Sequence, residues 1–170
     1  MPFSFLPRMI FPHLTDVTAE ALRARGISFL MLDFDNTIVP YTTSKPTLEM
    51  AAWLKAMQAS GIGLCVVSNS RKPRVVEFCK QYGLDCITHA KKPFSRGIRA
   101  CLTRYALDPA ACALVGDQIF TDRLAAGLYG IPCLYTMPRG GDHQRGVQFK
   151  RRFEPYWLDR YYQKGGRLYE

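Results

Sequence analysis

The stretch Ile27-Ser-Phe-Leu-Met-Leu-Asp33-Phe-Asp35-Asn-Thr37 places two carboxylates directly after a run of apolar residues. A short apolar run that ends in polar residues is typical of a buried β-strand. If the strand continued past Asp33, the carboxylates at i and i+2 would point to the same side. A turn after Asp33 would instead let Asp33 and Asp35 serve different roles around one centre. The stretch therefore predicts a strand that leads into an acidic loop.

The rest of the chain repeats the pattern of an apolar strand followed by an amphipathic helix. Met50, Trp53, Leu54 and Met57 stand at the i, i+3, i+4 and i+7 positions of one helix face. Further strands are predicted over residues 62–68, 86–88, 112–117 and 131–135, with helices between them. Continuous apolar strands that alternate with helices indicate a parallel sheet covered on both faces. Right-handed crossovers then give a doubly wound, Rossmann-like α/β fold.

The composition fits a single domain over residues 1–170. The chain is 48% hydrophobic and 12% aromatic, enough to bury a core, which excludes a disordered protein. It has no repeat period and no apolar run of the roughly 18 residues that a membrane-spanning helix needs. Prolines at positions 2, 7 and 12 argue against a signal peptide. The six cysteines lack a Cys-x-x-Cys spacing, so we expect reduced thiols and a cytoplasmic protein.

The chain is strongly basic, with 23 Lys and Arg against 14 Asp and Glu and a net charge of +9. This excess of positive charge favours anionic partners such as phosphate esters, nucleic acid or an acidic lipid surface. The charge alone does not indicate which of these the protein binds. Beyond a core expected over residues 27–136, the extension 137–170 is basic and aromatic. Its cations include Lys150, Arg151, Arg152, Arg160, Lys164 and Arg167. Either it is an amphipathic helix broken near Pro155 with a solvated charged face, or it is an arm that binds anions.

Chemically reactive residues follow four of the predicted strands. In chain order they are Asp33-Phe-Asp35-Asn-Thr37, Ser68, Lys92-Pro93 and Gly116-Asp117 to Asp122. The carboxyl ends of parallel strands meet at one sheet edge, where open α/β sheets bind their ligands. Carboxylates clustered at this edge repel one another unless a cation neutralises their charge. Carboxylate oxygens are ligands that Mg²⁺ prefers. With Ser68, Lys92 and nearby amides to hold phosphoryl oxygens, the set contains the groups that phosphoryl transfer needs.

This ordered set resembles the haloacid dehalogenase-like (HAD) phosphohydrolase superfamily over about residues 27–136. The superfamily's hhhhDxDxT, S/T, K and GDxxxD motifs are similar to the four features above. More narrowly, the chain resembles the YqeG family of subfamily IIIA phosphatases over nearly its whole length. The stretches that carry this similarity include Asp16-Val-Thr18, Val67-Ser-Asn69, Lys91-Lys-Pro93, Gly116-Asp-Gln118 and the basic tail. The resemblance implies a HAD-type fold and a Mg²⁺-dependent phosphatase that works through an aspartyl-phosphate.

The resemblance also implies roles for the matching residues. Asp33 would be the nucleophile, and Asp35 would protonate the leaving group and then activate water. Lys92 would offset the charge that develops on the phosphoryl group. The implied substrate-binding set is Thr37, which would steady the loop, Ser68, Asn69 and Lys92. The implied metal set is Asp33, the Asp35 backbone carbonyl and Asp117, with Asp122 behind them.

The spacing of the motifs bears on the size of the substrate. Superfamily members with a lid insert it after the first or the second motif. Only 30 residues separate Thr37 from Ser68, and 23 separate Ser68 from Lys92, so we expect no cap domain. An uncapped crevice admits bulky substrates such as a phosphoprotein, a nucleic-acid end or a lipid headgroup.

Two alternatives to a general phosphatase remain at this point. The YqeG family is similar to phosphatidylglycerophosphate phosphatases, and a basic protein with aromatic residues at its edge could work at an anionic membrane surface. A non-catalytic module that binds RNA or ribosomes would also be basic. The intact set of carboxylates argues against this module, because a pure binder of nucleic acid does not need them.

Overall fold

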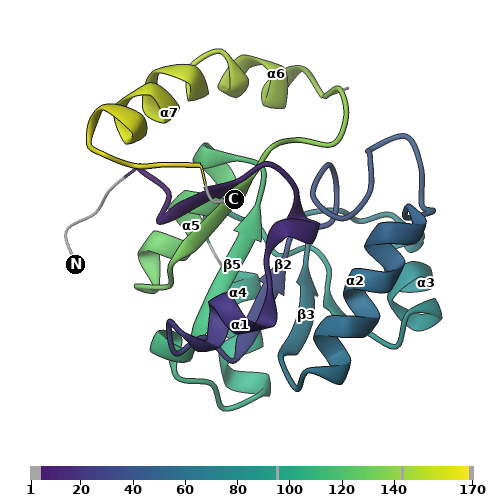
Figure 1. The fold of residues 1–170 in the computed structure, drawn as a ribbon. Helices are drawn as coiled ribbons and strands as arrows, with labels where there is room; N and C mark the ends of the chain where they lie inside the picture. Colours follow the sequence, from purple (N-terminus) through teal and green to yellow (C-terminus); the bar gives the residue numbers. More distant parts are fainter. Residues whose placement is uncertain (1–4, 95, 143, 169–170) are drawn as a thin grey trace.

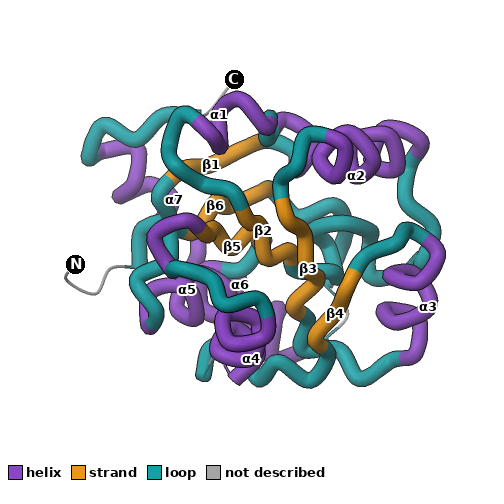
Figure 2. The backbone as a smooth tube through the Cα atoms, turned by 90° about the horizontal axis from the view of Figure 1, so that it is seen from below, coloured by secondary structure: helices purple, strands orange, loops and turns teal. Residues whose placement is uncertain are grey.

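A computed structural model describes residues 5–94, 96–142 and 144–168, which form a parallel sheet between two layers of helices (Figures 1 and 2). All neighbouring strands are parallel, in the order β1-β6-β5-β2-β3-β4. The strands are β1 (Met9–Phe11), β2 (Phe29–Leu32), β3 (Gly63–Val67), β4 (Asp85–Ile87), β5 (Cys112–Gly116) and β6 (Cys133–Thr136). The predicted doubly wound α/β fold is confirmed.

Helices cover both faces of the sheet because its central strands are apolar on both sides. In β2, Leu30 and Leu32 pack into one core cluster while Phe29 and Met31 pack into another. The first cluster lies under α1 (Ala19–Arg23), α2 (Leu48–Ala59) and α3 (Pro73–Gln81). The second lies under α4 (Arg96–Arg104) and α5 (Leu124–Leu128). Three short helical turns connect these elements: η1 (Leu14–Asp16), η2 (Pro109–Ala111) and the π-helical η3 (Ile119–Arg123).

The order of the strands opens a crevice at the carboxyl ends of β2 and β5. From β2 the chain proceeds outward to β3 and β4, and it then returns to the other side of β2 as β5. The connections that follow β2 and β5 therefore run in opposite directions along the sheet. The carboxyl ends of two such neighbouring strands are the usual place for a ligand in doubly wound folds. The backbone N–H of Asp33 still donates to the carbonyl of Val115 at 2.9 Å. The sheet thus fixes the starts of the loops that carry Asp33 and Asp117.

The structure departs from the sequence prediction at both ends of the sheet. Residues 9–11 form the edge strand β1, parallel to β6, although the first strand predicted from the sequence begins at Ile27. Phe11, in this strand, is buried, and Phe5 stacks on Trp157 at a centroid distance of 4.5 Å. The helix expected between the predicted strands at 112–117 and 131–135 begins as η3 and becomes α-helical only at α5.

The C-terminal segment folds as two helices, α6 (Arg145–Arg151) and α7 (Glu154–Gln163), with Pro155 in the first turn of α7. Figure 1 shows them as a yellow-green arc across the end of the sheet at which the strands finish. Tyr161 of α7 packs with Ile10 and Tyr135 in a third apolar cluster. Within the described part of the chain, no helix has the length and apolar character required to traverse a bilayer.

Candidate active site

The loop after β2 places two carboxylates in one cavity with different partners. The strand ends at Leu32, and a turn follows in which the N–H of Asn36, at φ 61°, donates to the carbonyl of Val39 at 2.7 Å. Asp33 and Asp35 both line the cavity. The Asp33 carboxylate contacts Lys92, whereas the Asp35 carboxylate forms an ion pair with the guanidinium of Arg74. A turn after Asp33 therefore separates the surroundings of the two acids, as one of the two readings of the sequence predicted.

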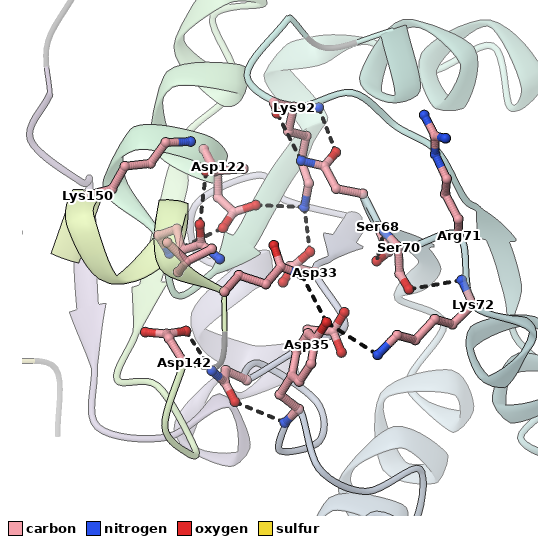
Figure 3. Close-up of a pocket in the computed structure, with 17 residues that line it drawn as sticks. Asp33, Asp35, Ser68, Ser70, Arg71, Lys72, Lys92, Asp122, Asp142 and Lys150 are labelled. Atoms are coloured by element: carbon pink, nitrogen blue, oxygen red, sulfur yellow. Dashed lines mark hydrogen bonds and ion pairs between the residues drawn. The ribbon is translucent and has the colours of Figure 1, made fainter.

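Lys92 lies at the centre of the acidic cluster. Its Nζ is 2.6 Å from Asp33 Oδ1 and 2.7 Å from Asp122 Oδ1, and its side chain is 1% exposed (Figure 3). Burial lowers the pKa of Lys92, but the two carboxylates outweigh burial and raise it above its ordinary value. The ammonium is therefore held in its charged form between the loops that follow β2 and β5.

Asn69 fixes the backbone of Lys92 in this position. The Lys92 N–H donates to Asn69 Oδ1 at 2.7 Å, and Asn69 Nδ2 donates to the Lys92 carbonyl at 2.9 Å. The side-chain amide of Asn69 is thus engaged by the lysine loop, although the residue also lines the cavity. Next to it, the buried Ser68 Oγ accepts the N–H of Ser70 at 3.1 Å and faces the same cavity.

The loop after β5 brings Asp117 and Asp122 to the cluster. An added Cβ at Gly116 would lie 2.4 Å from Asp122 Cγ, so only glycine allows this close approach. The N–H of Gln118 donates to Asp122 Oδ2 at 3.2 Å. Thr37 Oγ1 donates to Asp117 Oδ1 at 3.4 Å, which places Thr37 behind the metal-site candidates and outside the residues that line the cavity.

Three of these carboxylates fit a divalent cation. Asp33, Asp117 and Asp122 each offer one oxygen atom, and these atoms lie within 4.8 Å of one another. Burial raises the pKa of Asp33 to about 6 against the opposing effect of Lys92, and burial raises that of Asp117 well above its usual range. Buried acids held this close gain stability from a cation, and an all-oxygen set with room for water is what Mg²⁺ prefers.

Arg151 of α6 is a part of the site that the sequence did not single out. Its guanidinium contacts the carboxylate and the backbone carbonyl of Asp117, as well as Asp142 at 2.8 Å and Glu154 at 2.7 Å. Glu154 is 3% exposed and also accepts the N–H of Ile119 at 2.8 Å. In the sequence, Arg151 is only one of many tail cations, and nothing in its spacing distinguishes it. Only the packing of α6 shows its role.

The cavity above the cluster has a volume of about 400 Å³. Its floor carries Asp33, Ser68, Lys92 and Asp122. Its wall is built partly by the C-terminal segment, through Asp142, Gln144, Val147 and Lys150. The basic tail therefore contributes side chains to the same cavity as the four motifs.

A doubly wound parallel sheet with an acidic, lysine-centred site at its switch point is an arrangement suited to hydrolases of the phosphoryl-transfer type. The family model described as haloacid dehalogenase-like hydrolase matches residues 15–130, and the chain belongs to this family. The expectations that the chain is an enzyme and that it carries the HAD-type fold are thereby confirmed.

Individual relatives agree with this assignment. The chain is 27% identical over 161 residues to "Probable phosphatase YqeG" of Bacillus subtilis, covering 95% of this chain and 94% of that protein. It is 24% identical over 168 residues to "Phosphatidylglycerophosphate phosphatase 1, chloroplastic" of Chlamydomonas reinhardtii, covering 92% of this chain but only 62% of that protein. The crystal structure of a hypothetical protein from Xanthomonas campestris superimposes with a TM-score of 0.56 at 17% identity, over 96% of this chain and 98% of that one. This last similarity shows a shared fold.

Proposed function

We propose that the protein is a cytoplasmic, Mg²⁺-dependent phosphatase that hydrolyses a phosphate monoester through an aspartyl-phosphate on Asp33. One observation carries the proposal: the Asp33 carboxylate is 2.6 Å from the buried Lys92 ammonium at the floor of a cavity that also holds Asp35 and Ser68. A nucleophile, a cation for the phosphoryl oxygens and a second carboxylate at the mouth are the parts that this reaction requires. The relative named as a probable phosphatase supports the same activity.

In the first half of the reaction, a free oxygen of Asp33 attacks phosphorus. The bond from the Asp33 oxygen to phosphorus forms, and the ester P–O bond breaks. Asp35, which must leave its ion pair with Arg74 to carry a proton, gives that proton to the departing oxygen. In the second half, Asp35 takes a proton from the water that attacks phosphorus, which releases inorganic phosphate and regenerates the Asp33 carboxylate. Lys92 and Ser68 hold the phosphoryl oxygens throughout. Mg²⁺ bound by Asp33, Asp117 and Asp122, with the Asp35 carbonyl, would offset the negative charge that these carboxylates and the phosphoryl group bring together.

Removal of Mg²⁺ tests this proposal. We expect purified protein to release phosphate from para-nitrophenyl phosphate in Mg²⁺, and the rate to fall by about a hundredfold or more in EDTA, since a metal contributes several kcal/mol to such a transition state. Added Mg²⁺ restores the rate, and circular dichroism in EDTA verifies that the fold is intact. Equal rates with EDTA and with Mg²⁺ would contradict a metal-dependent mechanism.

A second candidate function, phosphatidylglycerophosphate hydrolysis at a membrane surface, has one specific observation in its favour. Phe149 and Phe153 are 61% and 51% exposed, and their rings pack at a centroid distance of 5.4 Å. They flank Lys150 and Arg152 on the segment that forms the cavity wall. Exposed aromatics among cations are typical of surfaces that bind anionic bilayers.

Vesicle binding tests this second candidate. We expect co-sedimentation with phosphatidylglycerol vesicles at low salt but not with neutral phosphatidylcholine vesicles. The double variant Phe149→Ser/Phe153→Ser should bind about tenfold more weakly, because the apolar anchors are lost. Leu48→Ser, at an exposed apolar residue at the start of α2, is the matched control. Failure of the unmodified protein to sediment with anionic vesicles would remove this candidate.

A further inference from the structure

Three cations at the mouth of the cavity have no role in the reaction described above. Arg71, Lys72 and Lys150 all line the cavity, and all three are exposed. None of them forms an ion pair with a carboxylate of the described residues. The other cations of the site behave differently, since Lys92, Arg74 and Arg151 each contact at least one carboxylate. The mouth therefore carries positive charge that no carboxylate of the described residues neutralises, and this charge is available to bind an anion.

The three cations come from two separate parts of the chain. Arg71 and Lys72 precede α3, whereas Lys150 belongs to α6. Figure 3 shows Lys150 on one side of the Asp33 carboxylate and Arg71 and Lys72 on the other. A ligand that reaches down to Asp33 must therefore pass between positive side chains.

Tyr41 holds one side of this mouth in place. Lys72 Nζ donates to Tyr41 Oη at 3.3 Å and lies 4.4 Å from the centroid of the tyrosine ring. Gln144 Nε2 donates to the same oxygen at 2.9 Å, so the tyrosine joins the Lys72 side of the mouth to the C-terminal segment. The ammonium of Lys72 is thereby positioned without being neutralised.

The size of the cavity leaves room beyond the scissile phosphoryl group. Small-molecule sites commonly measure about 300–1,000 Å³. The cavity, at about 400 Å³, lies within that range, and Ser68 and Lys92, which in the proposed function hold the phosphoryl group, are only two of its lining residues. The remaining space lies between the floor and the three exposed cations.

We propose that Lys72, Lys150 and Arg71 form a second anion subsite, which selects phosphate monoesters that carry a further phosphate or phosphodiester group. The inference rests on the proposed phosphatase function and names its substrate class. The scissile group binds at Lys92, while the second anionic group lies at the mouth between the two sides of the cavity. Charge-assisted hydrogen bonds from the mouth hold the substrate, and the positive potential attracts it before it docks.

A matched substrate pair tests the subsite. For the unmodified protein in Mg²⁺ we expect kcat/KM for fructose 1,6-bisphosphate to exceed that for fructose 6-phosphate by about tenfold or more. The ratio should fall several-fold in Lys72→Gln and in Lys150→Gln, and fall further toward one in the double variant, which keeps only Arg71 of the three cations. Lys55→Gln, on the exposed face of α2, removes the same charge elsewhere and should keep the ratio. Equal kcat/KM for the two sugars, or a ratio that survives the double variant, would overturn the subsite.

Two further arms identify the source of the second anionic group and separate this inference from the proposed function. A short-chain, monomeric phosphatidylglycerophosphate should share the preference, because the subsite recognises the phosphodiester and not a bilayer. A preference confined to lipid in vesicles would overturn the subsite in favour of surface binding. Calorimetry on Asp33→Asn should show tighter binding of the bisphosphate than of the monophosphate in Mg²⁺. Absence of phosphate release from every ester would defeat the proposed function, whereas equal affinities in this binding assay would defeat the subsite.

Discussion

Asp33→Asn abolishes phosphate release, with kcat reduced by on the order of a thousandfold or more, because a neutral amide oxygen does not attack phosphorus as a carboxylate does. The substitution preserves the shape of the side chain, and Lys92 retains Asp122 as a partner at 2.7 Å. We therefore expect the variant to fold. Steady-state release of inorganic phosphate measures the loss, and acid-quenched mass spectrometry should detect a phosphorylated Asp33 only in the unmodified protein.

The matched control for this prediction is Asp159→Asn. Asp159 is exposed on α7, where it accepts a hydrogen bond from Gln163 at 2.6 Å, and it does not line the cavity. The same chemical change there should leave kcat within about twofold of the unmodified value. An Asp33→Asn protein that retained a comparable rate would show that another group is the nucleophile.

Arg151→Met has the second large effect, a loss of about 3–5 kcal/mol in the free energy of unfolding. The guanidinium touches three acids, of which Asp117 and Glu154 are buried, and an apolar side chain would leave them without a cation. Urea unfolding should show a lower midpoint at an unchanged slope, since the surface exposed on unfolding is nearly the same. We expect kcat to fall as well, because Asp117 loses the contact that fixes its carboxylate.

The neighbouring residue supplies the control. Arg152 is exposed, and no carboxylate among the described residues forms an ion pair with it. Arg152→Met makes the same substitution one position along the chain and should change stability by no more than about 0.5 kcal/mol. Equal losses for the two variants would mean that the helix, and not the Arg151 contacts, determines the effect.

The fold could be predicted because its signals are local. An apolar strand followed by a helix of clear periodicity recurs along the chain, and parallel pairing then follows from the length of the connections. Strand β1 could not be predicted in this way, because a strand of three residues is too short to display a period. The start of η3 is held by a tertiary contact, because the N–H of Ile119 donates to the Glu154 carboxylate of α7 at 2.8 Å.

In the candidate site too, some features could be predicted from local sequence signals and others depend on tertiary packing. Asp33, Lys92 and Asp117 follow strands of one parallel sheet, so their convergence could be inferred before any coordinates were known. The hydrogen bonds that Asn69 makes to the Lys92 backbone, and the contact of Arg151 with Asp117, depend on how loops and helices pack. No spacing within the sequence encodes them.

The late position of Arg151 has a consequence for synthesis of the protein. The strands of the sheet and the acids that follow them are all translated earlier, and Arg151 comes 34 residues after its partner Asp117. A nascent chain that stops before α6 therefore contains every motif residue, yet it lacks the guanidinium and the cavity-lining side chains of Val147 and Lys150. Ribosomal elongation thus delays completion of this cavity until α6 has been synthesised.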